Sequence, residues 1–266
     1  MQKSNSKWYL LLDREPLEGS WNMAVDDYLF RTLEEKPLTY VRFYRWERPT
    51  ISLGYSQKVS RVVNLPYCQQ NGVDIVRRLT GGKLVLHNKE VTYSVCSSDG
   101  DTFTSTLKGS YKRISKALME GLKRMSLDPY LADAPPVSYV RGTMPCFSYP
   151  ARDEIEIQGK KMIGSAQKRL GPKFVQHGSI PLQEEEELLR SVTFLEERKD
   201  VVRVISISRA LGKTVRFDWA VDHFIKGFED YFGIQLEPKE FNEEEKERIR
   251  QIQRDRYEND DWTYGK

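Results

Sequence analysis

The feature that most constrains the fold is the way strand-like stretches are grouped along the chain. Apolar and β-branched stretches with strand periodicity occur up to residue 182, often in pairs separated by short turns. Strands joined by short turns pair antiparallel, whereas parallel strands need a long crossover. The pattern therefore predicts an α+β protein with a mixed, largely antiparallel β-sheet flanked by helices. The expected strands are 6–13, 38–46, 50–56, 73–79, 83–88, 90–97 and 174–182, with hairpins at 83–97 and 153–165.

Five segments are expected to form helices, from apolar spacing or from the pattern of their charges. The clearest is 104–126, where apolar residues keep one face and lysines and arginines keep the other. Ser20 is the predicted N-cap of the first helix, and Gly233 is expected to end the fourth. The expected helices are 19–33, 104–126, 182–195, 217–233 and 241–257.

Composition excludes several classes of protein. With 39% hydrophobic and 30% charged residues, the chain is typical of a globular protein with a sizeable core. A net charge of +3 is too balanced for nucleic acid as a main partner, and no apolar run suits a signal peptide or a membrane span. No repeat or linker divides the sequence. We expect a cytoplasmic protein in which residues 1–266 form a single domain.

The cysteines are too few and too scattered for a disulfide framework or a zinc site. Cys68, Cys96 and Cys146 contain no CxxC pair, and the three histidines contain no HxxxH pair, so we expect no metal site. Each cysteine is most simply a small buried residue. Cys146 differs in its context, because it follows Pro145 in a loop where burial is harder to arrange. It is therefore also a candidate nucleophile.

The stretch RRLTGGKLVLHNKEVTYS contains a glycine turn that allows two interpretations. Gly81 and Gly82 can form a tight turn between strands, which needs no ligand to explain it. Alternatively, backbone N–H groups at this turn, next to Arg78 and Thr80, approach the carbonyl or phosphate of a ligand. The pattern alone leaves both interpretations open.

Two histidines lie in segments that could form a site. His87 follows the glycine turn by one strand, and His177 lies in the stretch QHGS. A single histidine is more often a hydrogen-bonded structural residue than a catalytic base. The pattern does not decide between these roles for either residue.

The segment EIEIQGKKMIGSAQ predicts a hairpin with a two-residue loop at 158–159. In that register Glu156 faces Lys161, and Ile155 faces Met162. Lys161 could then be half of a replaceable ion pair, worth about a few tenths of a kcal/mol, whose loss would hardly change stability. The alternative is that Lys161 serves an active site.

Four segments taken together resemble a known family. They are RRLTGGKLVLHNKEVTYSV, CFSYPARDEIEIQGKKMIGSAQKR, QHGSI and YENDDWTYGK, in this order and with family-like spacing. They resemble the octanoyltransferases of the LipM type, within the biotin- and lipoate-protein ligase superfamily. The likeness extends from WNMAVDD near the N-terminus to the last residues.

The resemblance implies the biotin/lipoate-protein ligase catalytic-domain fold and a reaction. An octanoyl group would pass from octanoyl-acyl carrier protein to a lysine of a lipoyl-accepting protein, such as the H protein of glycine cleavage. It implies no cofactor, and we expect a monomer that binds neither nucleic acid nor membrane.

The resemblance also implies the site residues. Cys146 matches the family's nucleophile, and Lys161 matches its site lysine. Ala151 and Asn88 depart from the serine and aspartate that are usual there, which affects only loop geometry. The positions that match substrate-binding residues are Arg78, Thr80, Gly81, Gly82, His87, Gly164, Ser165, Ala166 and His177.

The implied chemistry needs no nucleotide. A thioester donor passes its acyl group to a cysteine, and a lysine amine then takes it as a more stable amide. A nearby ammonium would lower the pKa of the cysteine, and an apolar pocket would hold the eight-carbon chain.

Three other functions remain open at this point. An ATP-dependent lipoate ligase typically has a third glycine, where Lys83 stands here, and an accessory C-terminal domain. An amidotransferase would move octanoyl groups between lipoyl proteins. A binding protein without activity is the third, against which the intact Cys146 and Lys161 argue. The basic side of 104–126 is either a docking surface for the acidic carrier protein or a solvated face.

Overall fold

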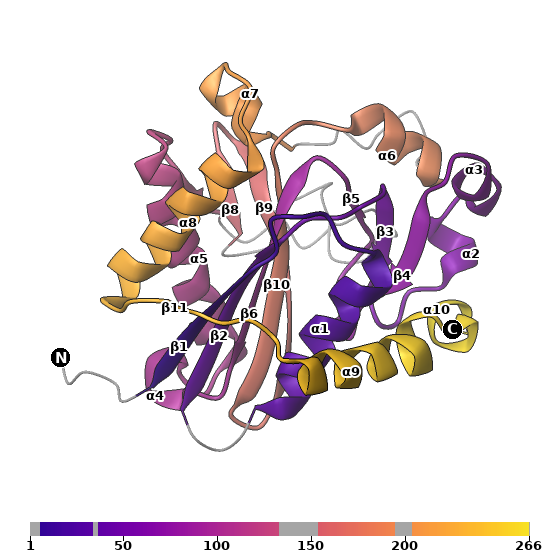
Figure 1. Ribbon diagram of the computed structural model, residues 1–266. Helices are drawn as coiled ribbons and strands as arrows, with labels where there is room; N and C mark the ends of the chain where they lie inside the picture. Colours follow the sequence, from indigo (N-terminus) through magenta and orange to yellow (C-terminus); the bar gives the residue numbers. More distant parts are fainter. Residues whose placement is uncertain (1–5, 34–36, 133–153, 195–203, 266) are drawn as a thin grey trace.

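An eight-stranded sheet forms the centre of the molecule (Figure 1). The computed structural model describes residues 6–33, 37–132, 154–194 and 204–265. The strand order is β11-β1-β2-β6-β10-β9-β8-β7, in which β1 runs parallel to β2 and β11 and the other neighbours are antiparallel. This confirms the predicted mixed, largely antiparallel sheet. The strands are β1 Lys7–Leu12, β2 Leu38–Tyr44, β6 Glu90–Ser97, β7 Tyr130–Leu131, β8 Ile155–Ile157, β9 Lys160–Leu170, β10 Lys173–Pro181 and β11 Glu237–Pro238.

A smaller sheet holds β4 (Asp74–Arg77), β3 (Thr50–Leu53) and β5 (Val85–His87), in that order. The predicted hairpin at 83–97 is therefore wrong, because β5 pairs with β3 whereas β6 pairs with β2 and β10. The chain crosses between the sheets at residues 88–89. A bend that carries the chain from one sheet to another can be as short as a hairpin loop, so the length of the connection does not distinguish a bend from a hairpin.

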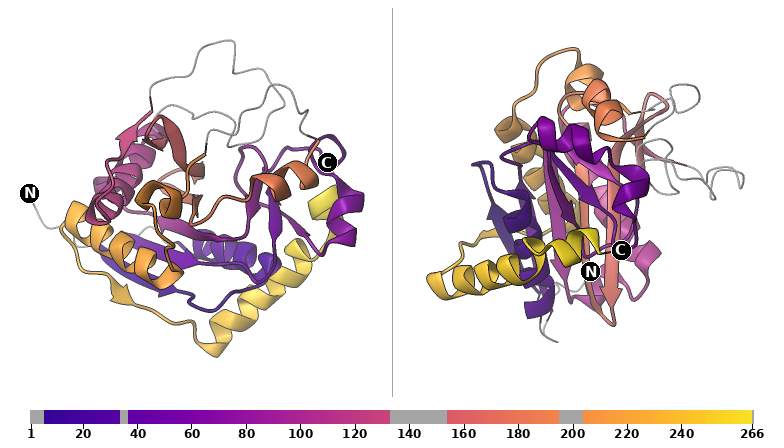
Figure 2. Two further views of the ribbon diagram at one scale, coloured as in Figure 1. Left: turned by 90° about the horizontal axis from the view of Figure 1, so that it is seen from above. Right: turned by 90° about the vertical axis from the view of Figure 1, so that its right-hand side faces the viewer.

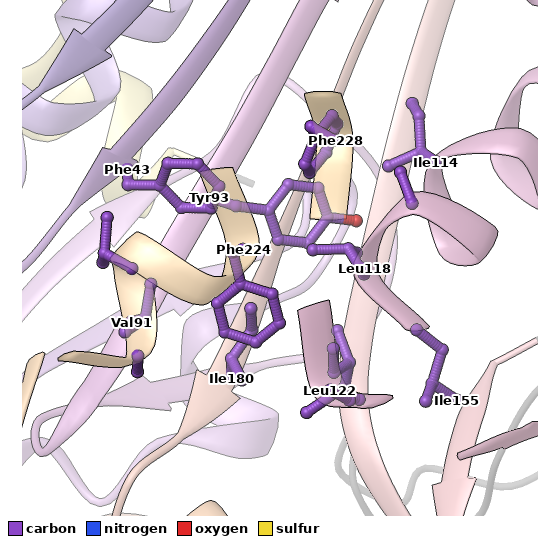
Figure 3. Packing of buried hydrophobic residues seen from close by; sticks show 14 of the residues in the cluster. Phe43, Val91, Tyr93, Ile114, Leu118, Leu122, Ile155, Ile180, Phe224 and Phe228 are labelled. Atoms are coloured by element: carbon purple, nitrogen blue, oxygen red, sulfur yellow. The ribbon is translucent and has the colours of Figure 1, made fainter. Parts of the chain in front are cut away.

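Helices cover both faces of the large sheet (Figures 1 and 2). On one face α5 and α8 lie side by side, and Phe43 and Tyr93 of the sheet pack with Leu118 and Phe224 of these helices (Figure 3). Burying one such phenylalanine contributes about 1.5–3 kcal/mol. Tyr44, the next residue along β2, belongs to the cluster under α1 on the opposite face, and α9 packs against α1. The helices are α1 Gly19–Thr32, α2 Val59–Val62, α3 Leu65–Gln70, α4 Gly100–Phe103, α5 Leu107–Arg124, α6 Glu186–Val192, α7 Ile207–Leu211, α8 Phe217–Phe232, α9 Glu243–Ile252 and α10 Asp260–Tyr264.

The predicted helices are present with altered ends. Gly233, in the left-handed conformation at φ 65°, ends α8 as expected. Ser20 is not an N-cap, because α1 already begins at Gly19 and the Ser20 hydroxyl accepts a hydrogen bond from Gln253 instead. The helix expected at 182–195 is reduced to α6, and α9 passes into a π-helical turn at Gln253–Tyr257. Across the described ranges, no helix has the length and apolar character needed to cross a membrane.

The hairpin of β8 and β9 has the predicted two-residue loop. Gln158 and Gly159 both have positive φ angles, 53° and 72°, which match the twist of the flanking strands. Glu156 lies opposite Lys161 as expected. Ile155 lies opposite Ile163 and not Met162, because an irregularity between residues 155 and 156 shifts the register.

Candidate active site

A cavity opens where the two sheets meet, with walls from α1, β5, β9 and β10. Its volume is about 20 Å³, which is room for about one water molecule, and Met23, Trp46 and Val85 supply apolar surface. Strand pairing brings Ala166 and His177 together on one face of the sheet. The predicted substrate-binding residues that line the cavity are Arg78, His87, Gly164, Ser165, Ala166 and His177.

His177 is held at both ring nitrogens. Its Nε2 lies 2.7 Å from the hydroxyl oxygen of Thr80, and its Nδ1 lies 2.9 Å from Oδ2 of Asp26. Burial lowers the pKa of His177, although the Asp26 carboxylate opposes that shift. We therefore assign a neutral ring whose Nδ1–H donates to Asp26 and whose Nε2 accepts from Thr80. In this state His177 has no nitrogen free to act as a base.

Asp26 is fully buried and needs partners to stay ionised. Arg42, also fully buried, lies 3.2 Å away and donates to the Asn22 side chain at 2.7 Å. Burial would raise the pKa of Asp26, but the hydrogen bond from His177 and the charge of Arg42 lower it. A carboxylate of α1 thus fixes one wall of the cavity through His177.

His87 is held in the same manner from the other side. Its Nδ1 lies 2.6 Å from Oε1 of Glu90, its Nε2 lies 2.6 Å from the Ser52 hydroxyl, and its ring stacks on Trp46 at 4.1 Å. Glu90 also accepts hydrogen bonds from two hydroxyl groups, those of Thr92 and Ser179. The second histidine is therefore a fixed part of the wall as well.

Arg78 shapes the glycine turn from inside. One nitrogen donates to the Ser52 carbonyl and hydroxyl at 2.5 and 2.6 Å, and the other donates to the carbonyls of Gly81 and Lys83 at 3.2 and 2.9 Å. Gly82 has a φ of 93°, a conformation that favours glycine. A Cβ placed on Gly81 would meet no atom within 4 Å, so the backbone of the turn is open on that side.

Lys161 forms a buried ion pair. Its Nζ lies 2.7 Å from Oε2 of Glu154, and the two side chains are 1% and 4% exposed. Its strand partner in register is Glu156, but its ion pair is with Glu154, beyond the irregularity in β8. Because both members of this pair are buried, we now expect replacement of Lys161 to cost more stability than the few tenths of a kcal/mol of an exposed pair. Lys160, the preceding residue, lines a different cavity.

Cys146 lies outside the described residues. The other two cysteines are buried and unbridged, as expected of small core residues. Burial raises the pKa of Cys68, and it raises the pKa of Cys96 well above its usual value. Neither thiol has the thiolate character that a nucleophile needs. The described residues contain no group of three or more His, Cys, Asp or Glu side chains that could hold a metal ion.

The sequence interpretation missed two carboxylates of the site, Asp26 and Glu90. A signal for each was available. Asp26 lies in NMAVDDYLF, a predicted helix in which most of its neighbours are apolar. Glu90 is the first residue of EVTYSVCS, a predicted strand that is otherwise mostly apolar. A carboxylate placed in a core requires a hydrogen-bonding partner, which the two histidines provide.

Comparison with known proteins places the chain in a family. It matches the model of the lipoyl protein ligase A/B catalytic domain over residues 18–229. The chain belongs to this family. Two curated relatives, both octanoyltransferases LipM, come from Geobacillus kaustophilus and Carboxydothermus hydrogenoformans. The first is 35% identical over 261 residues, 92% of this chain and 94% of the relative. The second is 34% identical over 264 residues, 95% and 97%.

Solved structures agree with the fold. Lipoate-protein ligase A bound with ATP superposes with a TM-score of 0.83 at 23% identity, covering 97% of this chain and 99% of the other. P. falciparum LipL1 in complex with lipoate gives a TM-score of 0.70 at 18% identity, covering 97% and 74%. The fold predicted from the resemblance is confirmed.

Proposed function

We propose that this protein is an acyltransferase of lipoate biosynthesis that transfers octanoyl groups without ATP. The observation that carries this proposal is its identity of 35% with an octanoyltransferase LipM across 92% of the chain. The cavity between the two sheets supports it, since three apolar side chains, Met23, Trp46 and Val85, line a space that also contains the predicted polar residues. At about 0.8 kcal/mol for each buried methylene, most of the acyl affinity can come from such contacts.

We further propose that octanoyl-acyl carrier protein is the donor and that Cys146 is the nucleophile. The thiolate of Cys146 attacks the thioester carbonyl, the bond from that carbon to the carrier sulfur breaks, and the carrier thiolate leaves and takes up a proton. The carbon then bears the enzyme sulfur. The two thioesters have similar free energies, so this step needs no coupled nucleotide hydrolysis.

In the second step the acceptor is a lysine of a lipoyl-domain protein, for which the glycine cleavage H protein is our candidate. Its neutral amine attacks the acyl carbon, the bond to the Cys146 sulfur breaks, and the nitrogen loses a proton as the amide forms. The amide is the more stable product, which makes the transfer favourable overall.

Lys161 is the proposed electrostatic partner of both steps. The ion pair with Glu154 holds its ammonium in a buried position, where a fixed positive charge acts strongly on developing negative charge. Such a charge favours the thiolate before the first step and the oxyanion during both. Glu154 would be a positioning residue for this ammonium.

The two histidines and Arg78 are proposed to shape the acyl site without transferring protons. Both ring nitrogens of His177 and of His87 are engaged in hydrogen bonds to neighbouring side chains. The backbone of the turn at Gly81 and Gly82, which is open at Gly81, is the proposed contact for the acyl carbonyl. These assignments distinguish residues that build the pocket from those that carry the reaction.

The remaining proposals concern the protein as a whole. We propose that it is a monomeric, cytoplasmic enzyme, that residues 1–266 form one domain, and that it works without a cofactor. These proposals accord with the composition and with the coverage of its relatives, 94% for the first of them.

One experiment tests the function. The purified protein is incubated with octanoyl-acyl carrier protein and an apo lipoyl-domain acceptor, with and without ATP, and the mass of the acceptor is measured. We expect the acceptor to gain one octanoyl group at the same rate in both mixtures. Modification that requires ATP and free octanoate or lipoate would instead identify a ligase.

A further inference from the structure

The closing motif YENDDWTYGK has no part in the chemistry described above. In the structure its described residues, 257–265, include α10, which lies beside β4 close to the C-terminus (Figure 1). Strand β4 ends at Arg77, immediately before Arg78, the residue that shapes the glycine turn. The C-terminal segment therefore lies beside the strand that leads into Arg78.

Arg77 joins two segments that are far apart in the sequence. Its side chain is fully buried and, among the described residues, donates only to backbone carbonyls. It reaches the Trp262 carbonyl at 2.9 Å and the Thr263 carbonyl at 2.6 Å. It also reaches three carbonyls of residues 54–57, at 2.8 to 3.1 Å. The indole N–H of Trp262 donates back to the Arg77 carbonyl at 3.0 Å.

Within the described residues no carboxylate pairs with Arg77. A guanidinium has several N–H donors in a fixed fork, and here that fork is satisfied entirely by backbone. These hydrogen bonds hold the backbone of two segments, 54–57 and 262–263, whereas an ion pair would hold only one acidic side chain. Arg77 thus links α10 to the loop at 54–57.

That loop in turn packs against the glycine turn. The N–H of Tyr55 donates to the Thr80 carbonyl at 2.8 Å. A Cβ on Gly54 would lie 1.9 Å from the Gly82 carbonyl oxygen, so the two backbones are in direct contact. Any displacement of the loop at 54–57 must therefore move the turn that we assign to the acyl carbonyl.

We propose that Trp262 of α10 is a positioning residue of the acyl-binding turn, acting through Arg77. The indole holds α10 in place by its bond to the Arg77 carbonyl and by the Arg256 guanidinium that lies 4.5 Å from its ring. If α10 is displaced, Arg77 loses the carbonyl acceptors at 262 and 263. We then expect its side chain to turn toward water, so that the loop at 54–57 and the glycine turn are no longer held in place.

The test compares full-length variants at two aromatic positions of the same segment. Trp262→Ala removes the indole, whereas Tyr264→Ala removes a side chain that is 43% exposed and that, within the described residues, makes no hydrogen bond to Arg77. Amide hydrogen exchange is measured in peptides covering 50–60 and 76–86, together with octanoyl transfer and thermal unfolding. We expect Trp262→Ala to speed exchange in both peptides by about tenfold or more, with little change in the peptides of α5 and α8.

The same variant should lose about tenfold or more in kcat/KM for the octanoyl donor, because a small displacement of a positioning group is costly. Tyr264→Ala should match wild type in exchange and in transfer. Trp262→Phe keeps the ring but not the N–H, and we expect faster exchange in the same two peptides by a smaller factor. Wild-type exchange in both Trp262 variants, or equal acceleration in Tyr264→Ala, would overturn the proposal.

The activity arm rests on the proposed function, but the exchange arm does not. If the wild-type protein transfers no octanoyl group, the proposed function fails while exchange still decides the positioning role. If wild type transfers the group and Trp262→Ala shows faster exchange but wild-type kcat/KM, the turn does not bind the acyl group as proposed and the inference fails.

Discussion

Replacing Lys161 by alanine should reduce both stability and activity, and a double variant should separate the two effects. Lys161 and Glu154 are 1% and 4% exposed and their charged atoms are 2.7 Å apart. Lys161→Ala leaves the Glu154 carboxylate buried without this partner, at a cost of about 3–5 kcal/mol. At about 2–4 °C for each kcal/mol in a chain of this size, the melting temperature should fall by about 6–20 °C.

The double variant Lys161→Met with Glu154→Gln removes both charges and keeps both volumes. Replacing a buried pair by neutral groups of similar shape is often nearly neutral, so most of the lost melting temperature should return. Activity should not return, because the ammonium that would stabilise the oxyanion is still missing, and one such donor is worth about a hundredfold or more in rate. Lys160→Ala, on the neighbouring position of β9, should resemble wild type in both measurements.

The assay is thermal unfolding combined with the rate at which a lipoyl-domain acceptor gains mass. A wild-type melting temperature for Lys161→Ala would refute the reasoning about the buried pair. Wild-type turnover in the double variant would refute the electrostatic role and return Lys161 to a purely structural one. The two conclusions are independent, because each variant is scored on both scales.

Three further predictions follow from the geometry. Gly54→Ala should lower the free energy of unfolding by about 1–3 kcal/mol and slow transfer, because its Cβ would overlap the Gly82 carbonyl. A Cβ on Gly100 would meet no atom within 4 Å, so Gly100→Ala should change neither quantity in unfolding and transfer assays. Reversing the charge of three exposed lysines of α5, none of them ion-paired in the described residues, should raise KM for octanoyl-acyl carrier protein about tenfold but leave KM for a small octanoyl thioester unchanged. Equal changes in KM for both donors would exclude docking of the carrier protein on this helix. The substitutions are Lys108→Glu, Lys112→Glu and Lys116→Glu. Burial lowers the pKa of His177 below 6.5, so the unfolded chain binds a proton that the folded chain does not as the pH falls below that value. Denaturant titrations should show stability falling there by up to about 1.4 kcal/mol per pH unit, and His177→Gln should flatten that slope; an unchanged slope would contradict the assignment.

Local patterns predicted the parts of the fold that local physics determines. The strand periodicity of residues such as Phe43 and Tyr44, which alternate between the two faces of β2, indicated the sheet, and the 3.6-residue spacing at 104–126 indicated α5. The loop at 158–159 was predictable because a two-residue turn requires positive φ angles, which Gly159 adopts readily.

What the sequence could not specify depends on contacts between distant segments. Nothing near residue 88 indicates that β5 turns away to pair with β3, because that choice is made by residues 50–53 on another strand. The one-residue shift opposite Ile163 likewise depends on packing around β8. For the same reason the sequence left open whether Lys161 has a replaceable partner at Glu156, since register alone does not reveal that Glu154 is buried beside it.

The candidate site was predicted mainly from the family resemblance. It indicated His87 and His177 as pocket residues, but it gave no role to Asp26 or Glu90, although both stand within the quoted stretches WNMAVDD and RRLTGGKLVLHNKEVTYSV. Asp26 lies on α1, about 150 residues before His177, and only the fold brings the two together. Hydrogen-bond partners of buried histidines are in general the part of a site that sequence spacing predicts least.

The central claim is that octanoyl transfer proceeds through a thioester on Cys146, and the intact mass of the protein after incubation with octanoyl-acyl carrier protein alone tests it most directly. We predict that the protein becomes heavier by one octanoyl group, that hydroxylamine removes the group, and that the modified peptide contains Cys146. In Cys146→Ala the adduct should be absent, while Cys68→Ala and Cys96→Ala should form it normally, since both of those thiols are buried with raised pKa values. An adduct of the same mass on Cys146→Ala would contradict the claim.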